Sequence, residues 1–428
     1  MKLKKSVLLA GLMGMMLLTG CSRSQMNYQI AEAIGTAGQY ENNEPVETPK
    51  MAAARKLVEE SESEEEGLVA VLDEAATLAA GYNYEEAISV LNTLTGEASR
   101  DERVDAARTE YEQGDASLVN WTGDIPHLCF PVLIEDTMMA FDGDSNASSY
   151  DTSMVTTDEF KDILQSLYDN NYILIDMESI AALVTDDRGT TSMTSQTLRL
   201  PEGKKPIVLS QDNLNYATVT NGDGIATKLV LDDEGNVKAQ YTDSEGHDQV
   251  GDYDFIPILN SFIEEHPDFS FKNARGIVSV SGEDGVFGYA LTDDNKSTIR
   301  SISSALTSGN WRIACAGWSH GYMNDLTDEA FEEEITNWMT EIGSLTGDAN
   351  ILFYPYGQEV TYPSEKLTCL LDNGLVYLCG LWGDTDFLEI GDGYMRMTRR
   401  FVDGYTLQNA SSYFTDFFDA GAILDDDR

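Results

Sequence analysis

From Pro126 onward, short apolar runs alternate with amphipathic helical patterns, and this alternation constrains the fold more than any other feature. Thr156-Thr157-Asp158-Glu159 is a capping box that opens a helix whose apolar residues share one face. Strands are predicted at 127–134, 172–175, 207–209, 276–280, 311–316 and 351–353, and helices at 177–184, 256–265, 299–306 and 331–342. About 300 residues of such alternation predict one α/β domain, over 125–428, with a mostly parallel sheet or barrel.

Two further segments accompany this domain. Residues 219–250 form an insertion, in which the runs 227–231 and 237–241 predict a hairpin. Helical periodicity over 67–118 predicts a small helical hairpin region, and Tyr82 to Ile88 resembles the inter-helix segment of a tetratricopeptide repeat. Because a solenoid needs about three repeats, we expect a hairpin packed on the main domain rather than a peptide-binding array.

The stretch before the helices, residues 21–66, is rich in charge and poor in apolar residues. In the run from Glu59 to Glu66 only Ser61 and Ser63 are uncharged. Such a composition cannot bury enough apolar surface to fold alone, so it predicts a flexible acidic tether. Within it, Met51 to Val58 has the pattern of a short helix.

The first twenty residues have the pattern of a secretory signal peptide. Three lysines precede an apolar run from Val7 to Leu18, which is too short for a comfortable membrane span. Leu18-Thr19-Gly20-Cys21 resembles a bacterial lipobox, and this resemblance implies cleavage before Cys21 and lipidation of its thiol; an ordinary signal with an incidental cysteine is the alternative. We therefore expect a protein anchored by lipid at the extracellular face of a bacterial membrane.

Net charge and cysteine spacing disfavour some classes of partner and of metal site. The chain has 27 basic and 74 acidic residues, a net charge of −47, which disfavours nucleic acid and anionic lipid as partners. After Cys21 four cysteines remain, with no zinc-finger spacing: Cys129, Cys315, Cys369 and Cys379. A Cys369–Cys379 bridge across a turn and buried free thiols are the two alternatives.

Polar residues follow three of the predicted strands, where α/β folds build their sites. Gln211-Asp212-Asn213 follows the first, Trp318-Ser319-His320 the second, and Pro355-Tyr356-Gly357 the third. In this order and spacing the motifs resemble the polysaccharide deacetylases of the NodB-homology class (carbohydrate esterase family 4), over about residues 125 to 405. The resemblance implies a distorted (β/α) barrel.

The resemblance also implies a reaction and roles for single residues. The family removes acetyl groups with a water activated by a divalent metal such as zinc, cobalt or manganese. Asp212 matches the catalytic base, His320 matches the second of two histidine ligands, and Tyr356 belongs to the turn that helps to bind acetate and the oxyanion. Trp318 and Pro355, with Tyr356, are the residues expected to contact substrate.

Three positions depart from the family pattern. Asn213 stands where the metal-binding aspartate is expected and offers only a neutral carbonyl oxygen. Ala316 stands at the first histidine position and offers no ligand, and Phe353 replaces an arginine often found two residues before the proline. Asp212, flanked by amides, is alternatively a structural hydrogen-bond hub. His127, at the start of the first strand, is a candidate for the barrel mouth.

Three functions follow from these observations. The first is a deacetylase-like lipoprotein with impaired catalysis that binds an acetylated polysaccharide or peptidoglycan. The second is an active metal-dependent glycan deacetylase with an altered ligand set. The third is an interaction protein in which the helical region recruits a protein partner.

Overall fold

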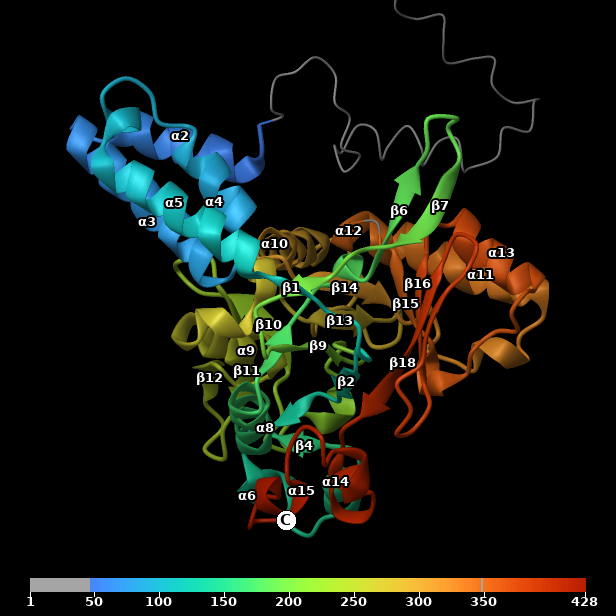
Figure 1. The fold of residues 1–428 in the computed structure, drawn as a ribbon. Helices are drawn as coiled ribbons and strands as arrows, with labels where there is room; N and C mark the ends of the chain where they lie inside the picture. Colours follow the sequence, from blue (N-terminus) through green and yellow to red (C-terminus); the bar gives the residue numbers. More distant parts are fainter. Residues whose placement is uncertain (1–46, 348) are drawn as a thin grey trace, which may run out of the picture. The chain divides into compact units, whose positions relative to one another are not determined.

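Seven parallel strands close into a barrel in this computed structural model, which describes residues 47–347 and 349–428 (Figure 1). Each strand pairs with the next, and β13 pairs with β9 as well as β14, which closes the ring. Around the barrel the order is β13 (Ile277–Val280), β14 (Arg312–Cys315), β15 (Ile351–Phe353), β16 (Tyr377–Leu381), β18 (Met395–Phe401), β2 (His127–Phe130) and β9 (Lys205–Gln211). This architecture confirms the predicted α/β fold class with a parallel barrel.

The barrel strands are buried on both faces, and their sequences are therefore short, nearly continuous apolar runs. Alternate residues face opposite ways. On β2, Leu128 and Phe130 pack outward under the helices, whereas His127 and Cys129 face the interior. The interior cluster contains small and medium side chains together with aromatic rings, among them Phe353 and Tyr377.

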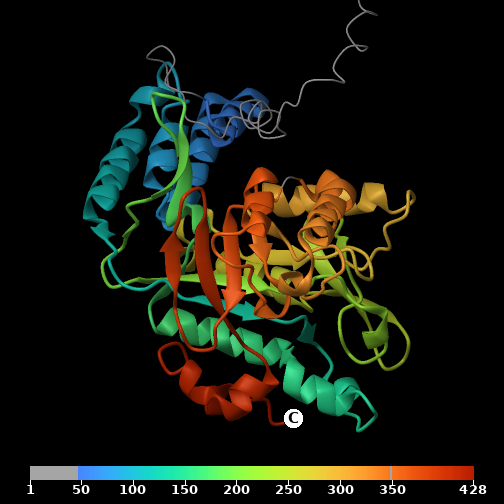
Figure 2. The same cartoon turned by 90° about the vertical axis from the view of Figure 1, so that its right-hand side faces the viewer.

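Helices cover the outside of the barrel (Figures 1 and 2). They are α8 (Thr157–Asp169), α9 (Phe255–Glu265), α10 (Lys296–Ser308), α11 (Asp328–Trp338) and α13 (Glu365–Asp372). The predicted capping box is confirmed, because the Thr156 hydroxyl accepts from the Glu159 N–H and the Glu159 carboxylate accepts from the Thr156 N–H. The same Glu159 carboxylate is buried and forms an ion pair with Arg428, whose Nε lies 2.5 Å from Oε1.

Between residue 47 and the barrel, the structure describes four α-helices: α2 (Pro49–Glu60), α3 (Glu64–Ala80), α4 (Tyr84–Leu91) and α5 (Glu102–Ser117). The tether predicted through residue 66 is therefore wrong from Pro49 on. Thr48 caps α2 and Ser63 caps α3, whose first turn carries three glutamates beside the positive end of the helix dipole. Met51 and Ala54 are buried, so the segment gains the apolar contacts that its composition alone does not suggest. The predicted signal peptide and Cys21 lie outside the described residues.

One other predicted element needs correction. The helix predicted over 177–184 is a short 3₁₀ turn followed by β6 (Ala181–Thr185), which forms a hairpin with β7 (Thr191–Ser195). A short apolar run is compatible with a strand as well as with a helix. Here the Asp186 N–H donates to the Thr190 carbonyl, and this turn joins the two strands into a hairpin. Of the two alternatives for the cysteines, free thiols are confirmed, because Cys369 and Cys379 form no bridge.

The insertion has three strands rather than two: β10 (Lys228–Leu231), β11 (Val237–Thr242) and β12 (Asp248–Gly251). The remaining elements are β1 (Val119–Asn120), β3 (Leu133–Ile134), α6 (Thr137–Ala140), α7 (Ala147–Ser153), β4 (Val155–Thr156), β5 (Tyr172–Leu174), β8 (Arg199–Leu200), α12 (Ser344–Thr346), β17 (Leu388–Ile390), α14 (Gly404–Asn409) and α15 (Ala420–Ile423). Across the described ranges, no helix has the length and apolarity needed to cross a bilayer.

Candidate functional site

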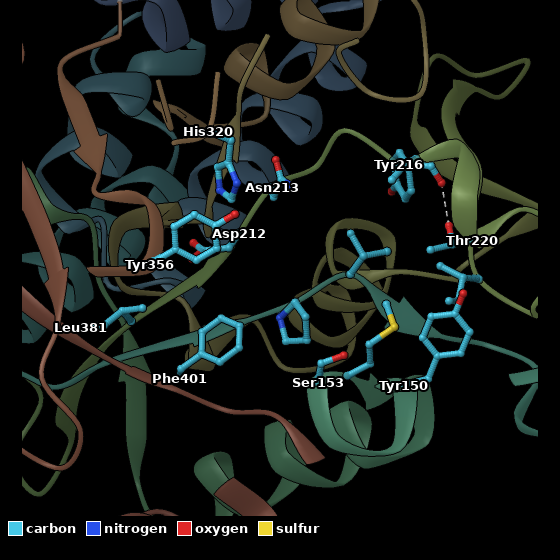
Figure 3. Close-up of a pocket in the computed structure, with 15 residues that line it drawn as sticks. Tyr150, Ser153, Asp212, Asn213, Tyr216, Thr220, His320, Tyr356, Leu381 and Phe401 are labelled. Atoms are coloured by element: carbon cyan, nitrogen blue, oxygen red, sulfur yellow. Dashed lines mark hydrogen bonds between the residues drawn. The ribbon is translucent and has the colours of Figure 1, made fainter. Parts of the chain in front are cut away.

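A pocket of about 430 Å³ opens where the barrel strands end (Figure 3). Asp212 and Asn213 follow β9, His320 lies in the loop after β14, and Tyr356 follows β15. Because parallel strands present their carboxyl ends at one edge, residues far apart in sequence meet there. The rest of the lining is Pro131, Val132, Tyr150, Ser153, Met154, Tyr216, Ala217, Thr220, Ile225, Leu381 and Phe401.

Asp212 is held by an arginine that the sequence analysis missed. Its Oδ1 accepts a hydrogen bond from Nη1 of Arg399, on β18, and the two side chains form an ion pair. The flanking amides contact other groups: Gln211 donates to Asp254, and Asn215 donates to Ser281. The amides that flank Asp212 in the sequence therefore form no hydrogen bond with its carboxylate among the described residues, and the carboxylate instead faces a buried cation.

Arg399 also contacts the side chain at position 353. Its guanidinium carbon lies 3.9 Å from the centre of the Phe353 ring, so the cation stacks on the side chain that stands where the family resemblance leads one to expect arginine. Burial opposes the charge of Arg399, but Asp212 and two nearby cysteines raise its pKa above the ordinary value. A guanidinium thus reaches the mouth of the barrel from β18.

The barrel interior below this pair is polar. His127 is fully buried, its Nε2 lies 2.8 Å from the Ser210 hydroxyl, and it does not line the pocket. Burial, and then the charge of Arg399, hold the pKa of His127 well below its ordinary value. His127 Nδ1 and the Nε and Nη2 of Arg399 have no hydrogen-bond partner among the described residues.

Asn213 is fixed by the end of β13. Its backbone has a φ of +56°, a left-handed conformation that asparagine tolerates better than most residues. Its N–H donates to the Ser279 hydroxyl at 2.9 Å, and its Oδ1 accepts from the Ser281 hydroxyl at 3.3 Å. The one oxygen that Asn213 offers to a ligand is already engaged.

His320 lies beside Asp212 and Tyr356 in the pocket. Its ring centre is 5.2 Å from that of Tyr356. Burial lowers the pKa of His320, although Asp212 and two glutamates act in the opposite direction. The imidazole is therefore neutral at pH 7 and offers one donor and one acceptor.

The residues around His320 do not fit the metal site of the family. Ala316 is buried and has no ligating atom, and Asn213 is engaged by Ser281. Cys315 packs outward into the core, as expected for the neighbour of an inward-facing residue. In the part of the chain that the structure describes, no group of three or more His, Cys, Asp or Glu side chains is arranged to hold a metal ion.

The aromatic residues divide between the pocket rim and the core. Tyr356 is 55% exposed and stacks on Tyr322 with ring centres 4.8 Å apart, while Pro355 is buried beneath it. Trp318 packs over Gly282 and is not part of the pocket lining. Trp382 follows the lining residue Leu381 and is 40% exposed.

No protein-family model and no curated protein matches the sequence. Two solved structures are similar to the chain. One is a deacetylase, PplD, of Streptococcus pyogenes in complex with acetate, at 10% identity and a TM-score of 0.38, covering 67% of this chain and 98% of that chain. The other is a candidate polysaccharide deacetylase of Mycobacterium smegmatis, at 17% identity and a TM-score of 0.25, covering 36% of this chain and 46% of that chain.

Proposed function

We propose that this chain is a lipid-anchored protein of the bacterial cell surface that binds acetylated cell-wall or extracellular glycan in the barrel pocket, with impaired metal-dependent hydrolysis. The observation that carries the proposal is the meeting of Asp212, His320 and Tyr356 in one pocket, where Asn213 offers a neutral amide oxygen already hydrogen-bonded to Ser281 and Ala316 offers no ligand atom. Cys21 is the proposed lipidation site and attaches the chain to the membrane.

The chemistry of the pocket supports binding more than turnover. Hydrolysis of an acetamide requires a proton acceptor, an attacking water and a strongly polarised carbonyl. Asp212 supplies a carboxylate fixed by Arg399, and neutral His320 supplies one hydrogen-bond donor. A metal would be the strongest polarising group, and the residues at 213 and 316 are unsuited to hold one.

The test is calorimetric titration of residues 22–428 with chitotetraose and with muramyl fragments, beside acetate release from the same ligands. We expect binding in the wild type and in His320→Ala, with slow or no acetate release. Absence of binding by every acetylated glycan tested would contradict the proposal.

An active deacetylase with an altered ligand set is the second candidate. It is favoured by His320, which makes no hydrogen bond with the described residues and lies with Asp212 in the pocket. Zinc, cobalt and manganese binding to the wild type should be compared with binding to His320→Ala, which cancels the loose cation binding of an acidic surface. A tight site lost in His320→Ala would favour this candidate, and equal weak binding would exclude it.

A gain-of-function variant separates the two candidates further. Asn213→Asp with Ala316→His restores both family ligands beside His320. If the metal positions alone limit catalysis, this double variant should release acetate in the presence of zinc or cobalt while the wild type does not. Activity of the wild type equal to that of the double variant would show that the native residues already suffice.

A further inference from the structure

The pocket is larger and more apolar than an acetyl group requires. Its volume of about 430 Å³ falls in the range of about 300–1,000 Å³ typical of sites for drug-sized ligands. Among the 15 lining residues, Asp212 is the one charged side chain, although the chain carries 74 acidic and 27 basic residues. A cavity this free of charge in so charged a chain is suited to an apolar group.

Apolar side chains line the pocket from its Asp212 end toward its Tyr150 end. We call Pro131, Val132, Met154, Ile225 and Phe401 the apolar arm. In Figure 3, His320, Asp212, Asn213 and Tyr356 lie together, whereas Tyr150 and Thr220 lie at the other end of the pocket. Ile225 is 2% exposed and belongs to a small core cluster with Tyr150, against which Val132 and Met154 pack.

The wall of the arm is held by specific contacts. The Gly224 carbonyl accepts from the N–H groups of Glu135 and Asp136 at 2.8 and 2.9 Å. The Tyr150 hydroxyl donates to Asp223 Oδ2 at 2.6 Å. These hydrogen bonds connect the segment after β9 to the segment after β2, and they hold the residues of the apolar arm in position.

We propose that the site takes acylated rather than only acetylated substrates: the acyl carbonyl lies near Asp212 and His320, and an alkyl chain of several carbons occupies the apolar arm. This inference rests on the proposed function of the same pocket and specifies its substrate class. The occupant is an alkyl chain because the arm is continuous with the polar end and carries no charge to pair with a peptide or an anion.

The test uses a series of N-acyl glucosamines with acetyl, butanoyl, hexanoyl and octanoyl groups, titrated calorimetrically into residues 22–428. Each added methylene should tighten Kd about fourfold, which corresponds to about 0.8 kcal/mol per buried CH₂, until the arm is filled. Met154→Trp, which fills the arm, should reduce the ratio of octanoyl to acetyl affinity to near one. Val132→Phe is a second filling variant, should Met154→Trp fail to fold.

Met138→Trp is the matched control, because Met138 is 77% exposed and does not line the pocket. It should keep the dependence on chain length. Equal affinity along the series, or the same dependence in Met154→Trp as in the wild type, would overturn the inference. Chitotetraose binding without dependence on chain length would overturn the inference alone, whereas failure of both chitotetraose and every N-acyl glucosamine to bind would overturn the proposed function with it.

Discussion

Loss of Asp212 and loss of Arg399 should lower the free energy of unfolding by different amounts. The Arg399 side chain is 0% exposed, whereas that of Asp212 is 23% exposed at the pocket. Asp212→Asn keeps the shape but leaves the guanidinium without a carboxylate inside the barrel, and breaking a buried pair in this way costs about 3–5 kcal/mol. Arg399→Met leaves a carboxylate that water reaches through the pocket. It also removes two N–H-bearing nitrogens that have no partner among the described residues, each of which costs about 1–3 kcal/mol.

We therefore expect Arg399→Met to lower the free energy of unfolding by about 1 kcal/mol or less, and Asp212→Asn by about 3 kcal/mol. The double variant should have the same free energy of unfolding as Arg399→Met, because it no longer contains a buried guanidinium without a carboxylate partner. Urea unfolding at pH 7 measures all three. Asp293→Asn is the control: its carboxylate is 95% exposed and pairs with Lys296, so its midpoint should not move. A larger loss in Arg399→Met than in Asp212→Asn would refute the reasoning, because the exposure of the surviving partner would then not decide the cost.

Three other perturbations test separate parts of the structure. Arg428→Gln should lower the free energy of unfolding by about 3–5 kcal/mol, because Glu159 stays buried without its cation; a loss below 1 kcal/mol in urea, on the order of a surface pair, would contradict this. Gly224→Ala should lower the melting temperature and weaken hexanoyl-glucosamine binding, because φ is +72° and the new Cβ would lie 2.3 Å from the Asp136 carbonyl oxygen; an unchanged melt would contradict this. Acidification below pH 6.5 should reduce stability, because burial lowers the pKa of His127 and the unfolded chain then takes up a proton that the folded chain does not. His127→Phe should flatten that pH dependence, and an unchanged slope in urea titrations would exclude His127 as its source.

Local patterns predicted five of the seven barrel strands, namely β2, β9, β13, β14 and β15, because burial on both faces leaves a continuous apolar run, but they did not predict β16 and β18. The strand at 351–353 and the capping box at Thr156 are confirmed at the predicted positions. The same patterns were ambiguous at 177–184, where six apolar residues fit the period of a helix as well as that of a strand. They indicated a short helix at Met51 to Val58, within α2, but placed it in a flexible tether, since its buried face is made by only two side chains, Met51 and Ala54.

The chemistry at the strand ends was harder to predict than the strands. Motif spacing brought Asp212, His320 and Tyr356 to one pocket, and the structure places all three in its lining. The partner of Asp212 lies 187 residues away in sequence, on a different strand, so no local pattern connects the two. A signal did exist in Met395–Phe401, a strand that carries three arginines in a chain with few basic residues.

Closure of the barrel has a consequence for the order in which the protein folds. The strand that completes the ring, β18, pairs with β2 through Arg400 and Leu128, and these residues are more than half the chain apart. Pairings between such distant segments form late, because the loop between them must first be ordered. β18 also supplies Arg399 and Phe401 to the pocket. A chain that emerges from its N-terminus during synthesis can therefore form its helices and early strands at once, but it completes the pocket only in the last step of folding. During refolding, the time at which N-acyl glucosamine binding appears would therefore report when the ring closes.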